Sequence, residues 1–90
     1  MKKYKIKEGF VLRQIKDNYI VVALGKASKE FNGMMNLNET GAFIWNLLNG
    51  ENTVDDIVGK MTKEYDVSEE IAREDLEGFI DKLIQGGMVE

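Results

Sequence analysis

Residues 37–50 read LNETGAFIWNLLNG, and the hydrophobic period of the chain changes inside this stretch. Before Asn38 the apolar residues follow a period of two in β-rich runs, which is typical of strands. After Asn38 they recur every three or four positions, which is typical of helices. Asn favours a helix N-cap and Gly favours a helix end, so we expect a helix from Asn38 to Gly50. The stretch therefore marks the junction between a β-rich part and a helical part.

Three strands are expected before this junction. Residues 10–15 and 19–24 are two β-rich runs, separated by Lys16-Asp17-Asn18. Asp and Asn tolerate the positive φ that tight turns need, so the two runs predict a hairpin. Residues 25–29 are interpreted as a polar connection. A third short strand is expected over residues 31–37.

Two further helices are expected after the junction. Thr53 followed by Asp56 is a variant of the capping box, and Ser68 is a favourable N-cap. Gly86-Gly87 ends the last helix, and the residues after it are expected to fold back onto the core. The apolar stripe of the second helix comprises Val54, Ile57, Val58, Met61 and Tyr65. The expected buried face of the third comprises Ala72, Leu76, Phe79, Ile80 and Leu83.

Strands followed by helices predict an α+β fold. We expect one domain over residues 1–90, with a three-stranded antiparallel sheet followed by three helices in a winged-helix-turn-helix-like arrangement. Trp45 lies on the most apolar helix, and we interpret it as a core residue rather than as a stacking site.

Composition restricts the chemistry. The 90 residues include no Cys and no His, which removes disulfides, thiolate metal sites and the commonest general base. We therefore expect that the chain has no catalytic residues, no metal site and no cofactor, and that it is not an enzyme. Adjacent carboxylates such as Asp55-Asp56 are explained by helix capping. The apolar runs are too short to span a bilayer, and no signal-peptide segment follows the N-terminal lysines, so a cytoplasmic protein without membrane contact is expected.

Charge is distributed unevenly. Residues 1–30 hold eight Lys or Arg against three Asp or Glu, whereas residues 31–90 hold four against thirteen. A winged-helix shape suggests nucleic-acid binding, but a recognition helix needs basic residues to neutralise phosphates. Residues 68–84 instead hold six acidic residues against Arg73 and Lys82. Nucleic-acid binding through the basic sheet half is kept as an alternative, and no nucleic-acid partner is expected.

The stretch from Leu37 to Gly50 resembles the L-N-x-T-G-A-x-I-W-x-L-L-x-G signature of the PqqD-like family. The similarity in order and spacing extends over about residues 9–90. The further matching segments are Thr53-Val54-Asp55-Asp56-Ile57, Tyr65-Asp66-Val67, Asp75-Leu76-Glu77-Gly78-Phe79-Ile80-Asp81-Lys82-Leu83 and Gly87-Met88-Val89-Glu90.

This resemblance implies a peptide chaperone, also called a precursor-recognition element. Such proteins bind the leader of a ribosomally synthesised precursor peptide as an added strand, beside the third strand and against the third helix. They present it to a modifying enzyme, often a radical S-adenosylmethionine (radical SAM) maturase. The expected partners are therefore a leader peptide and that enzyme, and the chain itself is expected to be a monomer or a weak homodimer.

The third strand has the properties of an edge that is used for binding. The candidate peptide-binding residues there are Asn32, Gly33, Met34, Met35 and Asn36, none of them charged and none a proline. Proteins usually protect an exposed edge with charged residues or proline, so the absence of both here favours strand addition. A covered or central strand, or an edge that pairs in a homodimer, is the alternative. Alternation places Met34 and Met35 on opposite faces.

One flank of the last helix is a candidate wall of the peptide groove. It comprises Ile71, Asp75, Gly78 and Lys82. Gly78 costs about 1 kcal/mol relative to Ala inside a helix. Close approach of a guest backbone would explain it, and so would tight packing on the sheet. Asp75 and Lys82 would pair with charged leader side chains, or they form a solvated face.

Overall fold

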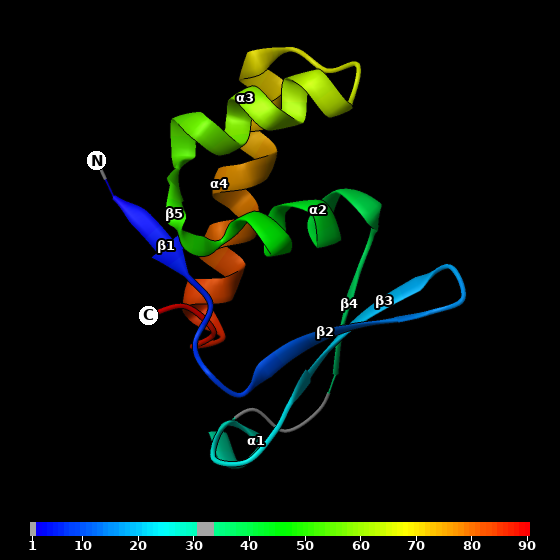
Figure 1. Cartoon of the computed structure of the whole chain (residues 1–90), viewed down its shortest axis with the longest axis vertical. Coiled ribbons are helices and arrows are strands. Elements are labelled where there is room, and N and C mark those ends of the chain that lie inside the picture. The colour runs from blue at the N-terminus through cyan, green and yellow to red at the C-terminus, as the bar shows by residue number, and fades with distance from the viewer. Residues whose placement is uncertain (1, 31–33) are drawn as a thin grey trace.

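A three-stranded antiparallel sheet lies below a group of helices, with a second, two-stranded sheet beside them (Figure 1). The computed structural model describes residues 2–30 and 34–90. In chain order the elements are β1 (Lys3–Lys5), β2 (Phe10–Ile15), β3 (Asn18–Ala23), α1 (Ala27–Glu30), β4 (Met34–Leu37), α2 (Glu39–Leu47), β5 (Asn49–Thr53), α3 (Val54–Glu64) and α4 (Glu69–Gln85). The larger sheet has the order β2-β3-β4, which confirms the α+β prediction.

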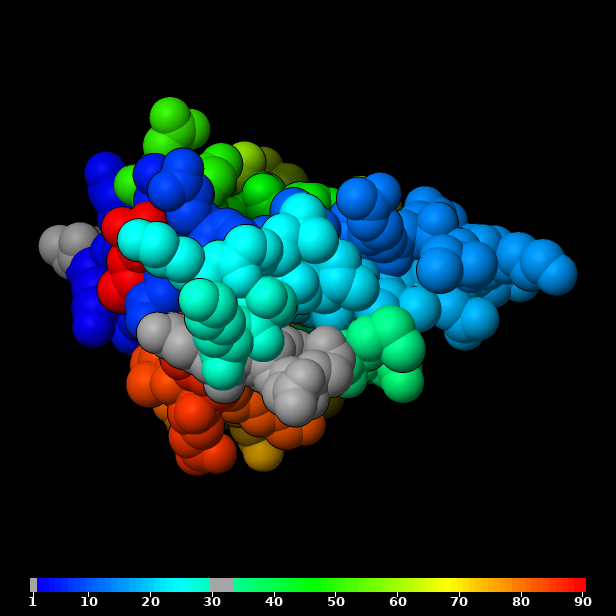
Figure 2. Space-filling view, turned by 90° about the horizontal axis from the view of Figure 1, so that it is seen from below, coloured from blue at the N-terminus to red at the C-terminus, as the bar shows by residue number. Residues whose placement is uncertain are grey.

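The hairpin of β2 and β3 forms as predicted. Ile15 lies opposite Asn18, so the turn consists of Lys16 and Asp17. The positive φ falls on Lys16, at 57°, and not on the Asp17-Asn18 pair that the sequence suggested. The register explains the difference, because Asn18 is already the first residue of β3. Figure 2 shows this hairpin projecting from the body of the molecule.

Three elements were missed by the sequence analysis. Residues 25–29 are not only a polar connection, because the short helix α1 begins at Ala27. The first predicted helix ends at Leu47 and not at Gly50, which lies inside β5 with a φ of 85°. Strands β1 and β5 form an antiparallel pair in which Lys3 lies opposite Thr53. Polar residues of low β-propensity become a strand here because a distant segment supplies their pairing partner.

The predicted helix caps are confirmed. The backbone N–H of Gly41 donates to the side chain of Asn38 at 2.7 Å. Thr53 and Asp56 form a complete capping box, with hydrogen bonds of 3.1 Å and 2.9 Å. The side chain of Ser68 accepts a hydrogen bond from the third helical residue at 3.2 Å. Each helix start is therefore fixed locally, before any tertiary contact is considered.

The core lies between the helices and the inner face of the larger sheet. Its most buried large side chains are Ile44, Ile57, Met61, Leu76, Leu83, Met88, Val21 and Val58. Trp45 is 7% exposed, so its assignment to the core is confirmed. Met88 and Val89 fold back onto the core as predicted, and Val89 forms a β-bridge with Ile6. The segment that follows β1 and the last residues of the chain are thereby paired near the C-terminal end of α4 (Figure 1).

Candidate functional site

Strand β4 is the terminal strand of the larger sheet. Across residues 2–30 and 34–90, only β3 pairs with it. No charged residue and no proline occurs between Met34 and Leu37. Asn32 and Gly33 were also predicted to belong to this edge, and they lie outside the described residues. The part of the predicted strand that is described is therefore an edge, neither central nor covered by a strand of the described chain.

The outward direction of the backbone follows from the hairpin. The N–H of Leu24 donates to the carbonyl of Gly9 at 2.6 Å, next to the β2–β3 pair. Backbone groups alternate in direction along a strand, so the even-numbered residues of β3 face β2 and the odd-numbered residues face β4. Val21, which faces β4, lies opposite Met35. The N–H and C=O groups of Met34 and Asn36 therefore point away from β3, towards the open edge.

Side chains of β4 alternate between solvent and core. Met34 is 69% exposed, whereas Met35 is half-buried and packs against the core. Asn36 is exposed and Leu37 is half-buried, in the same alternation. The prediction that Met34 and Met35 occupy opposite faces is thus confirmed. Met35 and Leu37 pack the strand against the core, while the backbone of Asn36 between them faces the open edge.

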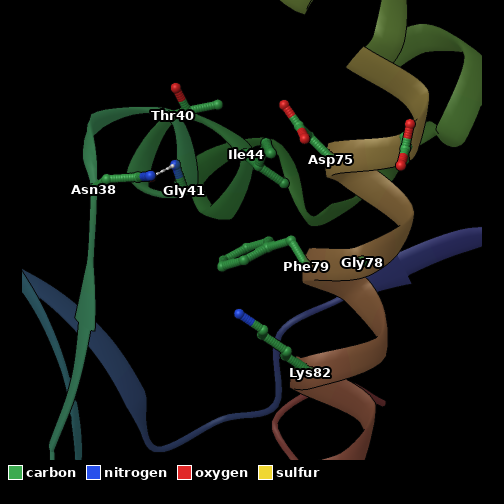
Figure 3. Close-up of a pocket in the computed structure, with 9 residues that line it drawn as sticks. Asn38, Thr40, Gly41, Ile44, Asp75, Gly78, Phe79 and Lys82 are labelled. Atoms are coloured by element: carbon green, nitrogen blue, oxygen red, sulfur yellow. Dashed lines mark hydrogen bonds between the residues drawn. The ribbon is translucent and has the colours of Figure 1, made fainter. Parts of the chain in front are cut away.

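A groove of about 560 Å³ lies between the start of α2, which directly follows β4, and helix α4 (Figure 3). The residues from the start of α2 that line it are Asn38, Thr40, Gly41 and Ile44. The residues from α4 that line it are Glu74, Asp75, Gly78, Phe79 and Lys82. In Figure 3 Phe79 extends from α4 towards β4, with Asp75 above it and Lys82 below it. The groove is thus largely polar, with Ile44 and Phe79 as its large apolar side chains and three charged residues along the wall that α4 forms.

Three of the four candidate residues on the last helix line this groove. They are Asp75, Gly78 and Lys82. Ile71 is 51% exposed and is not part of the lining. Thr40, Gly41 and Ile44 were not predicted to be site residues, because in the sequence they are only parts of a capped, apolar helix. Their position directly after an edge strand was the signal that would have indicated them.

Phe79 is a correction to the predicted core. It was assigned to the buried face of the helix, but it is half-buried and lines the groove. A β-carbon built on Gly41 would lie 3.5 Å from Cε1 of Phe79. The aromatic ring therefore lies beside the first turn of α2, at a distance of ordinary van der Waals contact. Phe79 sits at the margin of the core because the groove between α2 and α4 opens beside it.

Gly78 is exposed, and its surroundings decide between the two explanations given above. Outside its immediate neighbours and the backbone of its own helix, no described atom lies within 4 Å of a β-carbon built on it. Tight packing on the sheet is therefore not the reason for this glycine. The position instead leaves a smooth section of helix surface in the wall of the groove.

Ion pairing on α4 is concentrated on another face of the helix. Arg73 donates a hydrogen bond of 2.7 Å to Asp55, and its guanidinium also lies 3.7 Å from Glu69. The hydrogen bond from Arg73 to Asp55 raises the pKa of the arginine. This arginine is therefore engaged within the chain, which removes one of the two basic residues that a nucleic-acid-binding helix would offer.

Residues 2–30 and 34–90 hold no group of three or more His, Cys, Asp or Glu arranged to bind a metal ion. Within the same two ranges, no helix has both the length and the apolar character needed to cross a membrane.

The fold and the groove define a class of small α+β domains in which an open sheet edge lies beside the last helix. Residues 18–89 match the family described as Coenzyme PQQ synthesis protein D (PqqD), and the chain belongs to this family. The resemblance found in the sequence is thereby confirmed. No curated protein sequence matches the chain.

Two solved structures are similar to this chain over nearly their whole lengths. The first is TbiB1 in complex with the TbiA(beta) leader peptide, at 26% identity, with 96% of this chain and 94% of that chain covered and a TM-score of 0.76. The second is lasso peptide synthetase B1 complexed with the leader peptide, at 20% identity, with 99% of both chains covered and a TM-score of 0.80. At that lower identity the second likeness concerns the fold.

Proposed function

We propose that this chain is a peptide-binding module that holds the leader of a ribosomally made precursor peptide for a modifying enzyme. The leader adds to β4 as a further strand and places alternate side chains in the groove against α4. Backbone hydrogen bonds give such an interaction its affinity, and the groove gives it selectivity.

The observation that carries the proposal is the outward-facing backbone of Met34 and Asn36, which no strand of residues 2–30 or 34–90 pairs with. Exposed strand edges pair readily with other chains, and proteins usually protect them. Here the edge carries no protecting residue between Met34 and Leu37, and a groove opens beside it. An extended peptide satisfies both features at once, because its backbone pairs with the strand while its side chains reach Phe79.

The similar structures support this proposal. TbiB1 was solved with a leader peptide bound, and it matches this chain at 26% identity over nearly the full length. Membership of the PqqD family points in the same direction. The role of the individual residues of β4 and α4 in binding is our proposal.

The chain would contribute binding and no covalent chemistry. The modifying enzyme supplies the reaction, and a radical SAM maturase is the partner that the family resemblance suggests. We place the complex in the cytoplasm, where ribosomal precursor peptides are made.

We predict that a short reading frame next to this gene encodes the precursor peptide, and the test uses its leader as a synthetic peptide. We expect a dissociation constant of micromolar or tighter, equivalent to about −8 kcal/mol or better. Peptides that are N-methylated at single positions then probe the pairing. Only alternate residues of an added strand direct their N–H groups towards β4. N-methylation of the residues in one alternating set should therefore weaken binding strongly, and N-methylation of the residues in the other set should have little effect.

An absence of binding by the unmethylated leader would contradict the proposed function. Binding that is insensitive to N-methylation of either set would contradict strand addition while leaving leader recognition intact. Light scattering over a concentration series separates the remaining alternative, in which the edge of β4 pairs with a second copy. A homodimer that persists when the leader is saturating would show that the edge has that other use.

A further inference from the structure

The wall of the groove carries opposite charges at its two ends. Asp75 lies near the end of the groove formed by Asn38 and Thr40, and Lys82 lies at the other end (Figure 3). Phe79 lies between the two, and Glu74 adds a second carboxylate to the lining. The remaining lining residues are uncharged, so the groove is negatively charged at the Asp75 end and positively charged at the Lys82 end.

The charged side chains at the two ends of the groove, Asp75 and Lys82, are not paired within the described chain. Asp75 and Lys82 form no ion pair with residues 2–30 or 34–90, in contrast to Arg73 on the same helix. The sequence of the helix contributes to this, because residues three or four positions apart are the neighbours that form ion pairs along one helix. Those positions around Lys82 and around Asp75 hold no residue of opposite charge. Both side chains are therefore available to a guest.

The directions of β4 and α4 determine which end of a guest strand lies near each of these charges. Strand β4 runs from Met34 towards Asn38, and α4 runs the opposite way, from Asp75 towards Lys82 (Figure 3). Both strand pairs of the larger sheet are antiparallel. A guest strand that continues this pattern runs antiparallel to β4. Its N-terminal part then lies near Asp75, and its C-terminal part lies near Lys82.

Spacing limits which guest residues face the two charges. Asp75 and Lys82 are seven positions apart, which is about 10.5 Å along the helix at about 1.5 Å per residue. An extended guest advances about 3.4 Å per residue, and alternate residues share a face. Residues i and i+4 of the guest are then about 13.6 Å apart, within the reach of flexible charged side chains. Residue i+2 lies between them, over Phe79.

We propose that the groove selects leader segments with a basic residue, an apolar residue and an acidic residue at alternate positions, in that order from N- to C-terminus. This inference rests on the proposed function and names the class of leader that the site accepts. The basic residue pairs with Asp75 and Glu74, the apolar residue contacts Phe79, and the acidic residue pairs with Lys82. The groove thus distinguishes peptides by the order of their charges along the chain, and not by their net charge.

The test compares three synthetic peptides in one β-prone host sequence of 12 residues. The forward peptide contains Lys-x-Leu-x-Glu, the reversed peptide contains Glu-x-Leu-x-Lys, and the neutral peptide contains Gln-x-Leu-x-Gln. The first two have the same composition and net charge. Affinity for the full chain is measured by fluorescence anisotropy at low salt. We expect the forward peptide to bind about five- to tenfold more tightly than the reversed peptide, with the neutral peptide between them.

A charge-exchange variant provides the second arm. In the double variant Asp75→Lys, Lys82→Glu, the forward peptide should lose its advantage over the reversed peptide. The matched control is Lys60→Glu, Asp81→Lys, which makes the same changes of charge on exposed residues outside this groove. The control should keep the forward preference. Circular dichroism checks that both variants fold, which is expected because all four positions are exposed.

Equal affinities of the forward and reversed peptides for the unaltered chain would overturn the charge-order proposal. An unchanged forward preference in the Asp75→Lys, Lys82→Glu variant would overturn it as well. Failure of all three peptides to bind would show that the three-residue pattern is insufficient, which is also contrary to the proposal. None of these results affects the proposed function, which is judged by the N-methylated natural leader.

Discussion

Asn36 lies opposite Ile20 in the antiparallel pair of β3 and β4, at a position where the two strands do not exchange backbone hydrogen bonds. The neighbouring pair of Val21 and Met35 is the one that exchanges them. The backbone of Asn36 consequently faces away from β3, where no strand of the described residues pairs with it, whereas the backbone of Met35 faces β3. This difference between adjacent residues makes the edge of β4 testable by single substitutions.

Asn36→Pro should leave the fold intact and weaken leader binding. Proline removes the outward N–H of residue 36, and an edge strand tolerates it where the N–H faces solvent. The loss of one backbone hydrogen bond, together with the bulk of the ring, should reduce affinity about five- to tenfold. Isothermal titration with the natural leader measures this effect, and circular dichroism reports the fold.

Met35→Pro is the matched change on the same strand. Its N–H faces β3, so proline there should destabilise the β3–β4 pair and lower the free energy of unfolding. A well-folded Met35→Pro variant with reduced affinity, beside an Asn36→Pro variant with normal affinity, would reverse the assigned directions of the backbone.

Gly78→Ala should have opposite effects on stability and on binding. Alanine is favoured over glycine inside a helix by about 1 kcal/mol, and the added β-carbon meets open space in the free chain. Urea denaturation should therefore show a more stable protein. The same methyl group projects into the groove, so affinity for the leader should fall by about tenfold, or about 1.4 kcal/mol.

Gly59→Ala is the control for this substitution. Gly59 is also exposed within a helix, and a β-carbon there also meets no described atom within 4 Å. It does not line the groove, so the variant should gain similar stability and bind the leader normally. Reduced binding in Gly59→Ala as well would indicate that added helix stability itself opposes binding.

Met88→Ala should strongly destabilise the protein. Met88 is 1% exposed, and its backbone carbonyl accepts a hydrogen bond of 2.8 Å from Lys7. Truncating a buried methionine typically costs about 2–5 kcal/mol of unfolding free energy. Met34→Ala is the comparison, because Met34 is 69% exposed and its truncation should change stability by less than about 0.5 kcal/mol. Similar losses in both variants would contradict the described position of the C-terminal segment.

The capping box at the start of α3 should make stability depend on acid pH. Hydrogen bonds from the backbone and side chain of Thr53 lower the pKa of Asp56 below its ordinary value of 3.8. The folded state therefore holds the proton less readily than the unfolded state. The resulting stabilisation is fully present above the ordinary pKa and is lost as the pH falls through the folded-state pKa.

Asp56→Asn removes this titration. Urea denaturation at several pH values between 7 and 3 should show the unaltered chain as the more stable protein at neutral pH, with the difference shrinking below about pH 4. Asp66→Asn removes the same charge where no side-chain hydrogen bond is present in the described structure, so it should not reproduce the pattern. A difference between Asp56→Asn and the unaltered chain that is constant with pH would disprove the assignment.

The features of the site that were predictable from the sequence are local. The lack of charge and proline in β4 and the flank of Asp75, Gly78 and Lys82 are visible as patterns. Phe79 was misplaced because helical periodicity assigns a residue to a face but does not show where the neighbouring elements leave a gap. The explanation of Gly78 required knowledge of the space around it, which no pattern provides.

The sequence by itself determined the α+β class, the hairpin, the caps at Asn38, Thr53 and Ser68, and most of the buried helix faces. These features depend on residues within a few positions of one another, so local propensity and periodicity suffice. The tertiary structure alone decided that β1 pairs with β5, that the backbone of Asn36 faces outward, and that Phe79 lines a groove. Each of these depends on which distant segment lies alongside, and the free energy of that pairing is not encoded in any short stretch of chain.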